Sequence, residues 1–506
     1  MLYKVSSASL IGIEAYVVDV EVDISFGLPA FVTVGLPDAA VRESKERVRA
    51  ALKNCGFDFP SRKITINLAP ADRRKEGSAF DLPIALGFLA YADLFPAERL
   101  QDYLFLGELA LDGSLKPGKG VLAATVLAKR EGFKGIVIPR GNEKEAALVR
   151  DLDVYGLEDL ARVLKLLNDP DAIFPSRYSL KELLPRPHYE VDFQEIKGQQ
   201  HVKRALEVAA AGSHNVLMIG PPGAGKTMLA RRLATILPPM TFEEIIEVTQ
   251  IYSAAGYLKN KGAVPERPFR APHHTISDAG MIGGGLVPRP GEVSLAHRGV
   301  LFLDELPEFR RKVLEDLRQP LEDGQVTISR ASVSVTFPCS FMLVAAMNSF
   351  EDTYQGLSPS TTTFTDNQKA RYYSKISGPL LDRIDIQVEV PKVNFQDIID
   401  KKEGESSAAI RKRIVRARRR QLQRFKKKKI LCNAHIGPKE VRKLCPVDGE
   451  GRALLEMAVN RLGFSARGYT RVLKVARTIA DLDGDERISP VHISEAIQYR
   501  MMDKYF

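Results

Sequence analysis

The stretch NVLMIGPPGAGKTMLARRLA, residues 215–234, decides the fold of the central part of this chain. Its apolar start, 215–219, predicts a short buried strand, and residues 228–234 predict the beginning of a helix. Between them, GPPGAGKT fits the pattern G-x-x-x-x-G-K-[ST] of a loop that holds phosphate with backbone N–H groups and a helix N-terminus. Strand, loop and helix together predict a nucleotide site in an α/β domain with a parallel sheet.

The loop itself supplies the predicted phosphate-binding residues. The amine of Lys226 is expected to reach the β- and γ-phosphate oxygens, and the hydroxyl of Thr227 is expected to hold Mg²⁺. The predicted cofactors are therefore ATP and Mg²⁺. The residues of the predicted loop are Gly220, Pro221, Pro222, Gly223, Ala224, Gly225, Lys226 and Thr227.

Polar residues follow two further apolar runs. GVLFLDE, residues 299–305, predicts a buried strand with Asp304 and Glu305 at its carboxyl end, the edge where ligands bind in open α/β sheets. We expect Asp304 to hold Mg²⁺ through water and Glu305 to orient and deprotonate the attacking water. A third run, 341–346, leads to Asn348, whose amide is expected to position that water. The alternatives are a helix cap for the two acids and a turn for Asn348.

One arginine is a candidate for contact with a neighbouring subunit. Arg383 lies in a short apolar stretch after a Gly-Pro break. A guanidinium there is expected to act as an arginine finger, which neutralises charge in the transition state. The alternative is an ion pair within the chain, with Asp382 or Asp385.

Length and composition limit the class of protein. The 506 residues, 44% of them hydrophobic, are too many for one core, so about three domains are expected. Net charge is +10, which is compatible with an anionic partner such as nucleic acid. The four cysteines have no CxxC spacing, and no run has the ~18 apolar residues that cross a bilayer. We expect a cytoplasmic protein with no membrane partner, whose N-terminus forms a strand pair rather than a signal peptide.

Composition and pattern divide the chain into four parts. Residues 1–168 mix strands and helices, and 169–192 form a proline-containing linker. Residues 193–391 carry strands followed by helices, the pattern of a parallel sheet. Residues 392–506 have helical periodicity throughout.

Many motifs in one order resemble AAA+ ATPases, and more closely the magnesium-chelatase-related branch with its YifB/ComM family. Stretches that carry the resemblance include FQEIKGQQHVKRALEVAAAG, PFRAPHHTISDAGMIGGG, SGPLLDRIDI and SARGYTRVLKVARTIADL. The resemblance covers essentially the whole chain and implies an AAA+ P-loop core followed by a C-terminal helical lid. It places Gly198 and Gln199 in the segment that meets adenine. It also implies that Asn348 is sensor 1, Arg383 the arginine finger and Arg467 the sensor 2 arginine.

The resemblance also implies two features that face a ring pore in related proteins. Residues from about 256 to 296 correspond to the insertion that this branch carries before the Walker B strand. Residues 326–337 are expected to form a hairpin before sensor 1, with Arg330 near its tip. An arginine there is expected to grip a phosphate backbone. The alternative is an exposed hairpin charge.

The first 168 residues resemble the Lon-protease fold, an α+β domain of the ribosomal S5 domain 2-like type. KEGSAFDLPIALGFL and LGELALDGSLKPGKGVLAATVLAKREGFKGIVIP carry this resemblance. Lon proteases use a Ser–Lys pair. Ser78 falls near the serine position, but Phe80 and Asp81 follow it, and Gly120 occupies the expected lysine position with Lys119 one step away. The domain is therefore predicted to be non-proteolytic.

One departure from the family concerns the segment after Asn348. Family members often carry a Cys-rich loop there, whereas this chain reads SFEDTYQGLSPSTTT. Without thiolates, a metal site in this loop is not expected.

A basic run predicts contact with DNA. RKRIVRARRRQLQRFKKKK, residues 411–429, contains no acid and, as a helix, is expected to present a broad cationic face. Such a face suits the phosphate backbone, without base readout. The alternative is a solvated helix or one that meets acids of the next subunit. The candidate DNA contacts on this helix are Arg413, Arg416, Arg420 and Arg424.

The resemblance to the ComM group implies a hexameric ring that migrates branched DNA in recombination and natural transformation. The second reading is an ATPase like the magnesium chelatase subunit, which drives metal insertion or remodels a partner. The third is an ATP-dependent protease that depends on Ser78.

Overall fold

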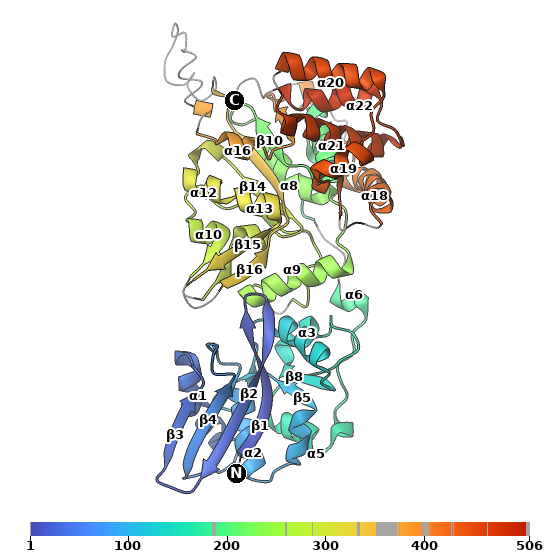
Figure 1. Ribbon diagram of the computed structural model, residues 1–506. Helices are drawn as coiled ribbons and strands as arrows, with labels where there is room; N and C mark the ends of the chain where they lie inside the picture. Colours follow the sequence, from blue (N-terminus) through green and yellow to red (C-terminus); the bar gives the residue numbers. More distant parts are fainter. Residues whose placement is uncertain are drawn as a thin grey trace. The chain divides into compact units, whose positions relative to one another are not determined.

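The structure is a computed structural model. It describes all residues except 1, 185–188, 259–260, 286, 331–333, 351–371, 374, 395, 398–403, 427, 429, 463 and 502–506. The chain forms two compact units, drawn in Figure 1. Unit 1 comprises Met1–Pro187 and Thr241–Pro265, and unit 2 comprises His188–Met240 and Glu266–Phe506. The segment Thr241–Pro265, which follows the predicted phosphate loop in sequence, thus packs with the N-terminal residues.

Unit 1 contains a four-stranded sheet in the order β1-β2-β4-β3. The predicted N-terminal strand pair is present as β1 (Leu2–Ile11) and β2 (Glu14–Ser25), which pair antiparallel. β4 (Lys63–Ala69) runs antiparallel to β2 and parallel to β3 (Ala30–Val34). Every second residue of β4 is buried, the alternation expected of a strand with one face on the core.

A second, parallel sheet and several helices complete unit 1. The sheet has the order β5-β8-β9, and helix α9 comes from Thr241–Pro265 and packs against α3. Ser253 Oγ of α9 donates a 2.7 Å hydrogen bond to buried Glu145, and the Gly120 N–H donates to Ser253 O at 3.1 Å. The elements are β5 (Tyr103–Phe105), β6 (Glu108–Leu109), β7 (Leu115–Lys116), β8 (Gly135–Pro139), β9 (Asp153–Leu157), α1 (Ala39–Asn54), α2 (Asp81–Tyr91), α3 (Val121–Glu131), α4 (Glu143–Ala146), α5 (Leu160–Asn168), α6 (Leu180–Leu183) and α9 (Phe242–Ala255).

Unit 2 is built on a five-stranded parallel sheet in the order β11-β14-β17-β10-β18. The three strands predicted from apolar runs are its centre and are buried along their whole length: β10 (Val216–Ile219), β14 (Val300–Leu303) and β17 (Met342–Met347). β11 (Phe269–Arg270) and β18 (Ile386–Glu389) are the edges. All five strands point the same way, so the loops after their carboxyl ends meet at one edge.

Two hairpins and several helices accompany this sheet. The predicted hairpin before sensor 1 is present as β15 and β16, and a smaller one, β12 with β13, precedes it. The elements are α7 (Gln200–Gly212), α8 (Lys226–Ile236), α10 (Asp278–Ile282), β12 (Gly283–Gly284), β13 (Arg289–Pro290), α11 (Glu292–Leu295), α12 (Arg311–Asp316), α13 (Arg318–Asp323), β15 (Gln325–Ser329), β16 (Ser334–Pro338) and α16 (Gly378–Leu381).

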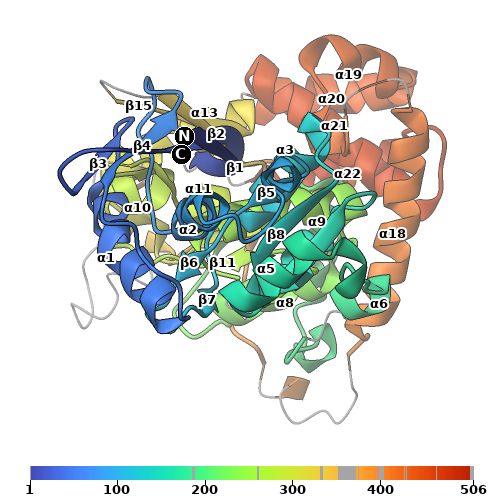
Figure 2. The same ribbon diagram turned by 90° about the horizontal axis from the view of Figure 1, so that it is seen from below.

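The C-terminal part of unit 2 is helical, as predicted. Its helices stand together in both ribbon views (Figures 1 and 2). Apolar side chains of α18 and α21, such as Ile414 and Val472, belong to the same buried cluster as Val216 and Val300 of the sheet. The helices are α18 (Ser407–Arg424), α19 (Pro438–Leu444), α20 (Gly449–Leu462), α21 (Ala466–Asp483) and α22 (Pro490–Gln498).

These features agree with the predicted α/β fold class and its helical C-terminus. Local sequence signals explain the boundaries of the helices. α21, for example, begins where the Ser465 side chain accepts a hydrogen bond from the Gly468 N–H, and it ends at Gly484 in a left-handed conformation. Among the described residues, no helix is long and apolar enough to cross a membrane.

Candidate nucleotide site

The loop between β10 and α8 has the backbone shape that phosphate binding requires. Gly223 and Gly225 have φ of 77° and 88°, values that favour glycine. A Cβ on Gly220 would lie 2.1 Å from the carbonyl oxygen of Val390, so a side chain does not fit there. Gly225 is also the N-cap of α8, which directs the N-terminus of that helix into the loop.

Lys226 is buried, and its amine lies at the centre of the loop. Nζ donates hydrogen bonds to the carbonyl oxygens of Gly220 and Pro221, at 2.7 and 2.9 Å. It also donates to Oδ1 of Asn348 at 2.9 Å. The predicted sensor 1 amide at the end of β17 therefore lies beside the predicted phosphate-binding amine.

The two predicted acids lie at the end of β14, next to Thr227. The Thr227 hydroxyl donates to Asp304 Oδ2 at 2.6 Å, and the Glu305 N–H donates to Asp304 Oδ1 at 3.0 Å. Glu305 itself has φ of 53°, in the left-handed region that non-glycine residues seldom adopt. Its Oε2 lies 3.4 Å from Nδ1 of His274.

A cavity of about 290 Å³ opens beside these residues. Its walls come from the start of α8, the end of β14 and the segment that follows β11. The lining residues are Thr227, Arg231, Ala271, Pro272, His273, His274, Phe302, Asp304 and Glu305.

The ligands offered by Thr227 and Asp304 fit Mg²⁺. Within the described part of the chain, no group of three or more His, Cys, Asp or Glu side chains could hold a metal ion. Mg²⁺ needs no such group, because it is usually held by one or two protein oxygens together with phosphate oxygens and water. A hydroxyl and a carboxylate 2.6 Å apart at the mouth of a phosphate loop match that pattern.

Gly198 and Gln199 precede α7 and reach the same loop. Gln199 Nε2 donates to the carbonyl oxygens of Ala224 and Pro391, at 3.0 and 2.7 Å. Its buried Oε1 has no hydrogen-bond partner among the described residues. Gly198 has φ of 57°, and a Cβ on it would lie 2.7 Å from Oδ2 of Asp397. The predicted adenine segment is thus joined to the phosphate loop and offers an acceptor.

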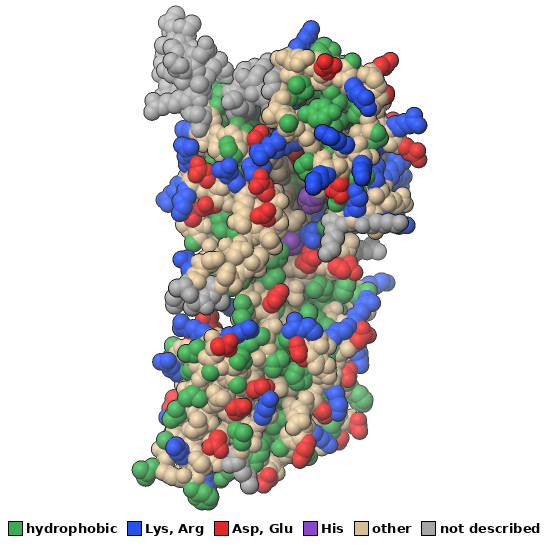
Figure 3. All heavy atoms as spheres, in the orientation of Figure 1, with side chains coloured by type: hydrophobic (Ala, Val, Ile, Leu, Met, Phe, Trp, Pro, Cys, Tyr) green, Lys and Arg blue, Asp and Glu red, His purple; other side chains and the backbone are tan. Residues whose placement is uncertain are grey.

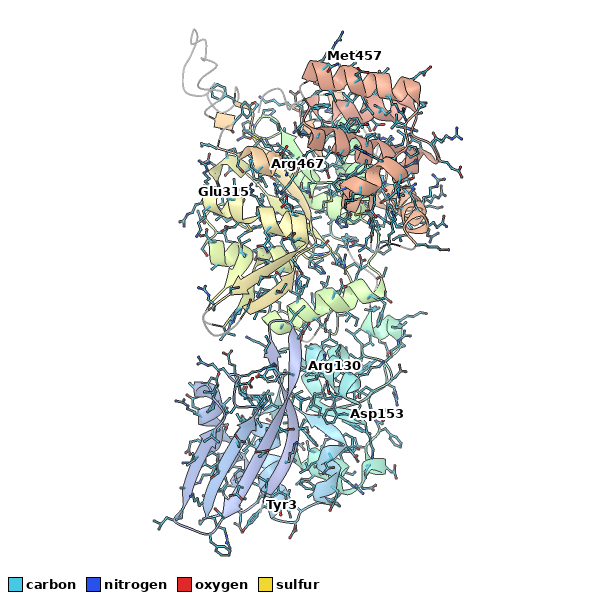
Figure 4. The ribbon with its side chains drawn as sticks, in the orientation of Figure 1. Tyr3, Arg130, Asp153, Glu315, Met457 and Arg467 are labelled. Atoms are coloured by element: carbon cyan, nitrogen blue, oxygen red, sulfur yellow. The ribbon has the colours of Figure 1, made fainter. Side chains whose placement is uncertain are left out.

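The two predicted catalytic arginines contact acids of their own chain. The Arg383 side chain is 10% exposed and bonds to Glu322 and to the carbonyl oxygen of Pro379. Its intrachain partner is neither of the two acids considered from sequence. Arg467, labelled in Figure 4 and 66% exposed, lies 3.4 Å from Asp382.

Asp385, beside these arginines, is a buried anion. Burial alone would raise its pKa. The hydrogen bond with His214 and the charges of Arg471 and Lys474 outweigh that effect and lower the pKa to about 2. The His214 Nδ1 to Asp385 Oδ2 distance is 3.1 Å.

The basic helix α18 uses several of its predicted DNA contacts within the chain. Arg413 bonds to Glu405 and, at 2.7 Å, to Glu207. Arg420 donates to the carbonyl oxygen of Asp481 at 2.8 Å, and Arg424 pairs with the Asp481 carboxylate. These contacts hold α18 against the rest of unit 2.

Three further cations of α18 lie on another side of the helix. Lys412, Arg416 and Arg419 are exposed, and among the described residues they make no ion pair or side-chain hydrogen bond. Their spacing of four and three residues places them along one stripe. Figure 3 shows Lys and Arg side chains gathered over the C-terminal helices.

Arg330 follows β15, where the chain leaves the hairpin ladder, and is exposed. Its guanidinium lies near Gly284 of the β12–β13 hairpin: a Cβ on Gly284 would be 3.6 Å from Arg330 Nη2. The two hairpins therefore lie side by side.

Comparison with known proteins decides the family. The chain is 45% identical over 504 residues to the competence protein ComM of Haemophilus influenzae, covering 98% of this chain and 97% of that one. It is 42% identical over 503 residues to the YifB proteins of Salmonella typhimurium and Escherichia coli, covering 99% of this chain and 97% of each.

The chain belongs to the YifB/ComM family. The family described as "Magnesium chelatase, subunit ChlI" matches residues 192–398. "Subunit ChlI of Mg-chelatase" matches 20–142, and "Magnesium chelatase, subunit ChlI C-terminal" matches 404–500. These matches support an ATPase of the magnesium-chelatase type.

This YifB/ComM protein also has a partial likeness to a Lon protease. It is 30% identical over 164 residues to Lon protease 2 of Bacillus subtilis, which covers 31% of this chain and 30% of that one. In unit 1, Ser78 Oγ bonds to Glu108, whereas Lys119 lies beside Gly256 in the segment after α9. Among the described contacts of Ser78 there is none with a lysine.

The segment that replaces the Cys-rich loop of some YifB/ComM proteins lies largely outside the described residues, which resume at 372. Sequence reasoning did not place Arg231, His273 or His274 in the site, although all three line the cavity. The tandem His273-His274 was a usable signal, because the chain has only eight histidines and this pair follows a strand of the sheet.

Proposed function

We propose that this protein is an ATPase motor that hydrolyses ATP-Mg²⁺ to remodel or translocate DNA. It would work as a hexameric ring and as a branch-migration helicase in recombination and natural transformation. The observation that carries the ATPase is the convergence of Lys226, Thr227, Asp304, Glu305 and Asn348 at one edge of the parallel sheet of unit 2.

Each of these side chains suits one step of the reaction. Lys226 exchanges its carbonyl acceptors for phosphate oxygens and offsets their charge. Thr227 and Asp304 hold Mg²⁺, which supplies further charge neutralisation on the phosphates. Glu305 orients the attacking water and accepts its proton, while Asn348 fixes the water's position. The free Oε1 of Gln199 is an acceptor for the adenine amine.

The two arginines would act when the ring assembles and the lid closes. Arg383 exchanges Glu322 for the γ-phosphate held by the neighbouring subunit, and Arg467 exchanges Asp382 for nucleotide in the closed lid. Both exchanges replace one anion by another with higher charge. Arg467 needs the smaller rearrangement of the two, because it is largely exposed and its 3.4 Å contact with Asp382 is loose.

Two observations support DNA as the substrate of the motor. One relative carries the name competence protein ComM. The structure also leaves Lys412, Arg416 and Arg419 exposed on one stripe of α18, and Arg330 exposed beside a second hairpin. Cations at helical spacing can follow a phosphate backbone without reading bases, and such binding weakens steeply with salt.

The test is the ATPase rate with single-stranded, duplex and junction DNA at two salt concentrations. We expect single-stranded or junction DNA to stimulate hydrolysis and added salt to weaken this effect. The triple variant Lys412→Gln, Arg416→Gln, Arg419→Gln should reduce the slope of log affinity against log salt by roughly one per residue.

A matched control removes the same charge elsewhere. Arg42→Gln, Lys53→Gln and Lys116→Gln change three exposed cations of unit 1 and should leave the slope unchanged. Hydrolysis that no DNA stimulates would refute the DNA motor and leave the ATPase intact. An equal reduction of the salt slope in both triple variants would show that DNA binding depends on the overall charge of the protein and not on α18.

A further inference from the structure

The segment that follows β11 brings a histidine to the predicted catalytic base. β11 and β14 are adjacent and parallel, with Phe269 opposite Val300 and Arg270 opposite Leu301. Both pairs differ by 31 residues, and the same offset relates His274 to Glu305. The strand pairing itself ends before these residues, so this parallel pair brings the two segments to the same edge of the sheet but does not by itself set their contact. At that edge, His274 Nδ1 lies 3.4 Å from Glu305 Oε2.

Several contacts fix the position of this segment. Arg270 makes a two-pronged ion pair with Glu292 of α11, both distances being 2.6 Å. The ring of His274 lies against that of His273, with centroids 4.1 Å apart, and meets the edge of Phe309 at 6.4 Å. The segment is therefore held before His274, and the imidazole itself packs against two rings on the cavity wall.

Glu305 has few other constraints on its side chain. The side chain is 57% exposed, and the backbone at this residue is in the left-handed region. A carboxylate that must hold a water molecule loses efficiency when it is free to rotate, because misplacement by about 1 Å can cost ~100-fold in rate. A neighbour that engages one carboxylate oxygen leaves the other for the water.

We propose that His274 is a positioning residue for Glu305. Its Nδ1 side engages Oε2 of the carboxylate, so that Oε1 faces the attacking water. This inference rests on the proposed ATPase function, in which Glu305 is the base. His273 belongs to the same cavity wall but has a different task, since its Nδ1 lies 2.9 Å from Thr275 Oγ1 within the segment.

The experiment measures single-turnover hydrolysis of ATP together with steady-state kcat and KM. His274→Ala should lower kcat about tenfold and change KM less than about twofold, because it affects the transition state and not ground-state binding. His274→Asn, which keeps an N–H donor near the place of Nδ1, should recover most of the rate.

A double-variant cycle shows whether His274 acts through Glu305. Adding His274→Ala to Glu305→Gln should change the residual rate less than twofold, because the group that His274 positions is already lost. A full tenfold loss in that background would overturn the proposal, as would wild-type kcat in His274→Ala. Wild-type hydrolysis by Glu305→Gln would instead refute the proposed role of Glu305, so the two failures are distinguishable.

Discussion

The nucleotide site of unit 2 and the Ser78 cluster of unit 1 contain similar side chains in different arrangements. In unit 2, the hydroxyl of Thr227 and the carboxylate of Asp304 lie on the wall of a cavity beside the Lys226 loop. In unit 1, the hydroxyl of Ser78 bonds to Glu108, and Asp81 next to it is fully buried. Both clusters have a hydroxyl and acids, and those of unit 2 line a cavity of about 290 Å³.

The two clusters also differ in their positively charged side chain. The Lys226 amine donates a hydrogen bond to Asn348, another polar residue of its site. The positive partner of the unit 1 cluster is Arg47, whose Nε bonds to Asp81 Oδ2 at 2.7 Å. An arginine stays protonated, so it cannot take a proton from a serine. Similar composition therefore supports chemistry in one unit and a structural ion pair in the other.

The largest expected effect comes from removing the amine of the nucleotide site. Lys226→Ala should lower ATP hydrolysis at least ~100-fold, because the charge that stabilises the phosphates in the transition state is lost. Nucleotide binding, measured by titration with a fluorescent ATP analogue, should be lost as well.

Unit 1 supplies a matched control for that change. Lys75 is also buried with its amine on backbone carbonyls, those of Pro70 and Arg73. Lys75→Ala should lower thermal stability and leave nucleotide binding and turnover per folded molecule unchanged. If Lys226→Ala hydrolysed ATP normally, the assignment of the nucleotide site would be wrong.

The sequence was informative about unit 2 wherever the signal was local. The three apolar runs became the central strands, because a buried parallel strand needs an unbroken apolar stretch, and each polar residue at their ends lies at one edge. The loop with Lys226 and Thr227 was predictable for the same reason: its geometry depends on glycines that lie within a few residues of one another in the sequence.

Contacts between distant residues were not predictable in this way. The periodicity of α18 places Arg413 and Arg424 on a helix, but only the tertiary fold brings Glu207 and Asp481 to them. The same limit applies to Arg383 and Glu322, and to α9, which packs with unit 1 although it follows the phosphate loop in sequence. His274 meets Glu305 because β11 and β14 are neighbours in the sheet, and the sequence alone does not show that they are.

Two buried aspartates, Asp81 of unit 1 and Asp385 of unit 2, should change the stability of the chain with pH in opposite directions, an effect of intermediate size. Burial raises the pKa of Asp81 to about 6 despite the bonds from Arg47 and the Leu109 N–H. The folded chain therefore keeps a proton on Asp81 between about pH 4 and pH 6 that the unfolded chain has lost. By linkage, this group should make the chain less stable as pH rises through that window, by on the order of 2 kcal/mol.

The measurement is calorimetric unfolding of the whole chain at pH 4.5 and 6.5, for wild type and Asp81→Asn. The variant should lose this part of the pH dependence. Asp385 has the opposite effect on stability. Its pKa is lowered to about 2, so the stability that its carboxylate contributes is present above about pH 4 and is lost as pH falls towards 2. An unchanged pH profile in Asp81→Asn would mean that Asp81 stays ionised beside Arg47 throughout.

The smallest expected effect is that of Ser78→Ala. The wild-type chain should not degrade casein, and the variant should keep the wild-type ATPase rate, because Ser78 bonds to Glu108 and none of its described contacts is with a lysine, the partner that a Ser–Lys pair requires. Loss of the hydrogen bond to Glu108 should cost about 1 kcal/mol of stability. Casein cleavage by wild type that disappears in Ser78→Ala would reverse the comparison. Unit 1 would then hold a second active site, with its proton acceptor among residues other than Lys119.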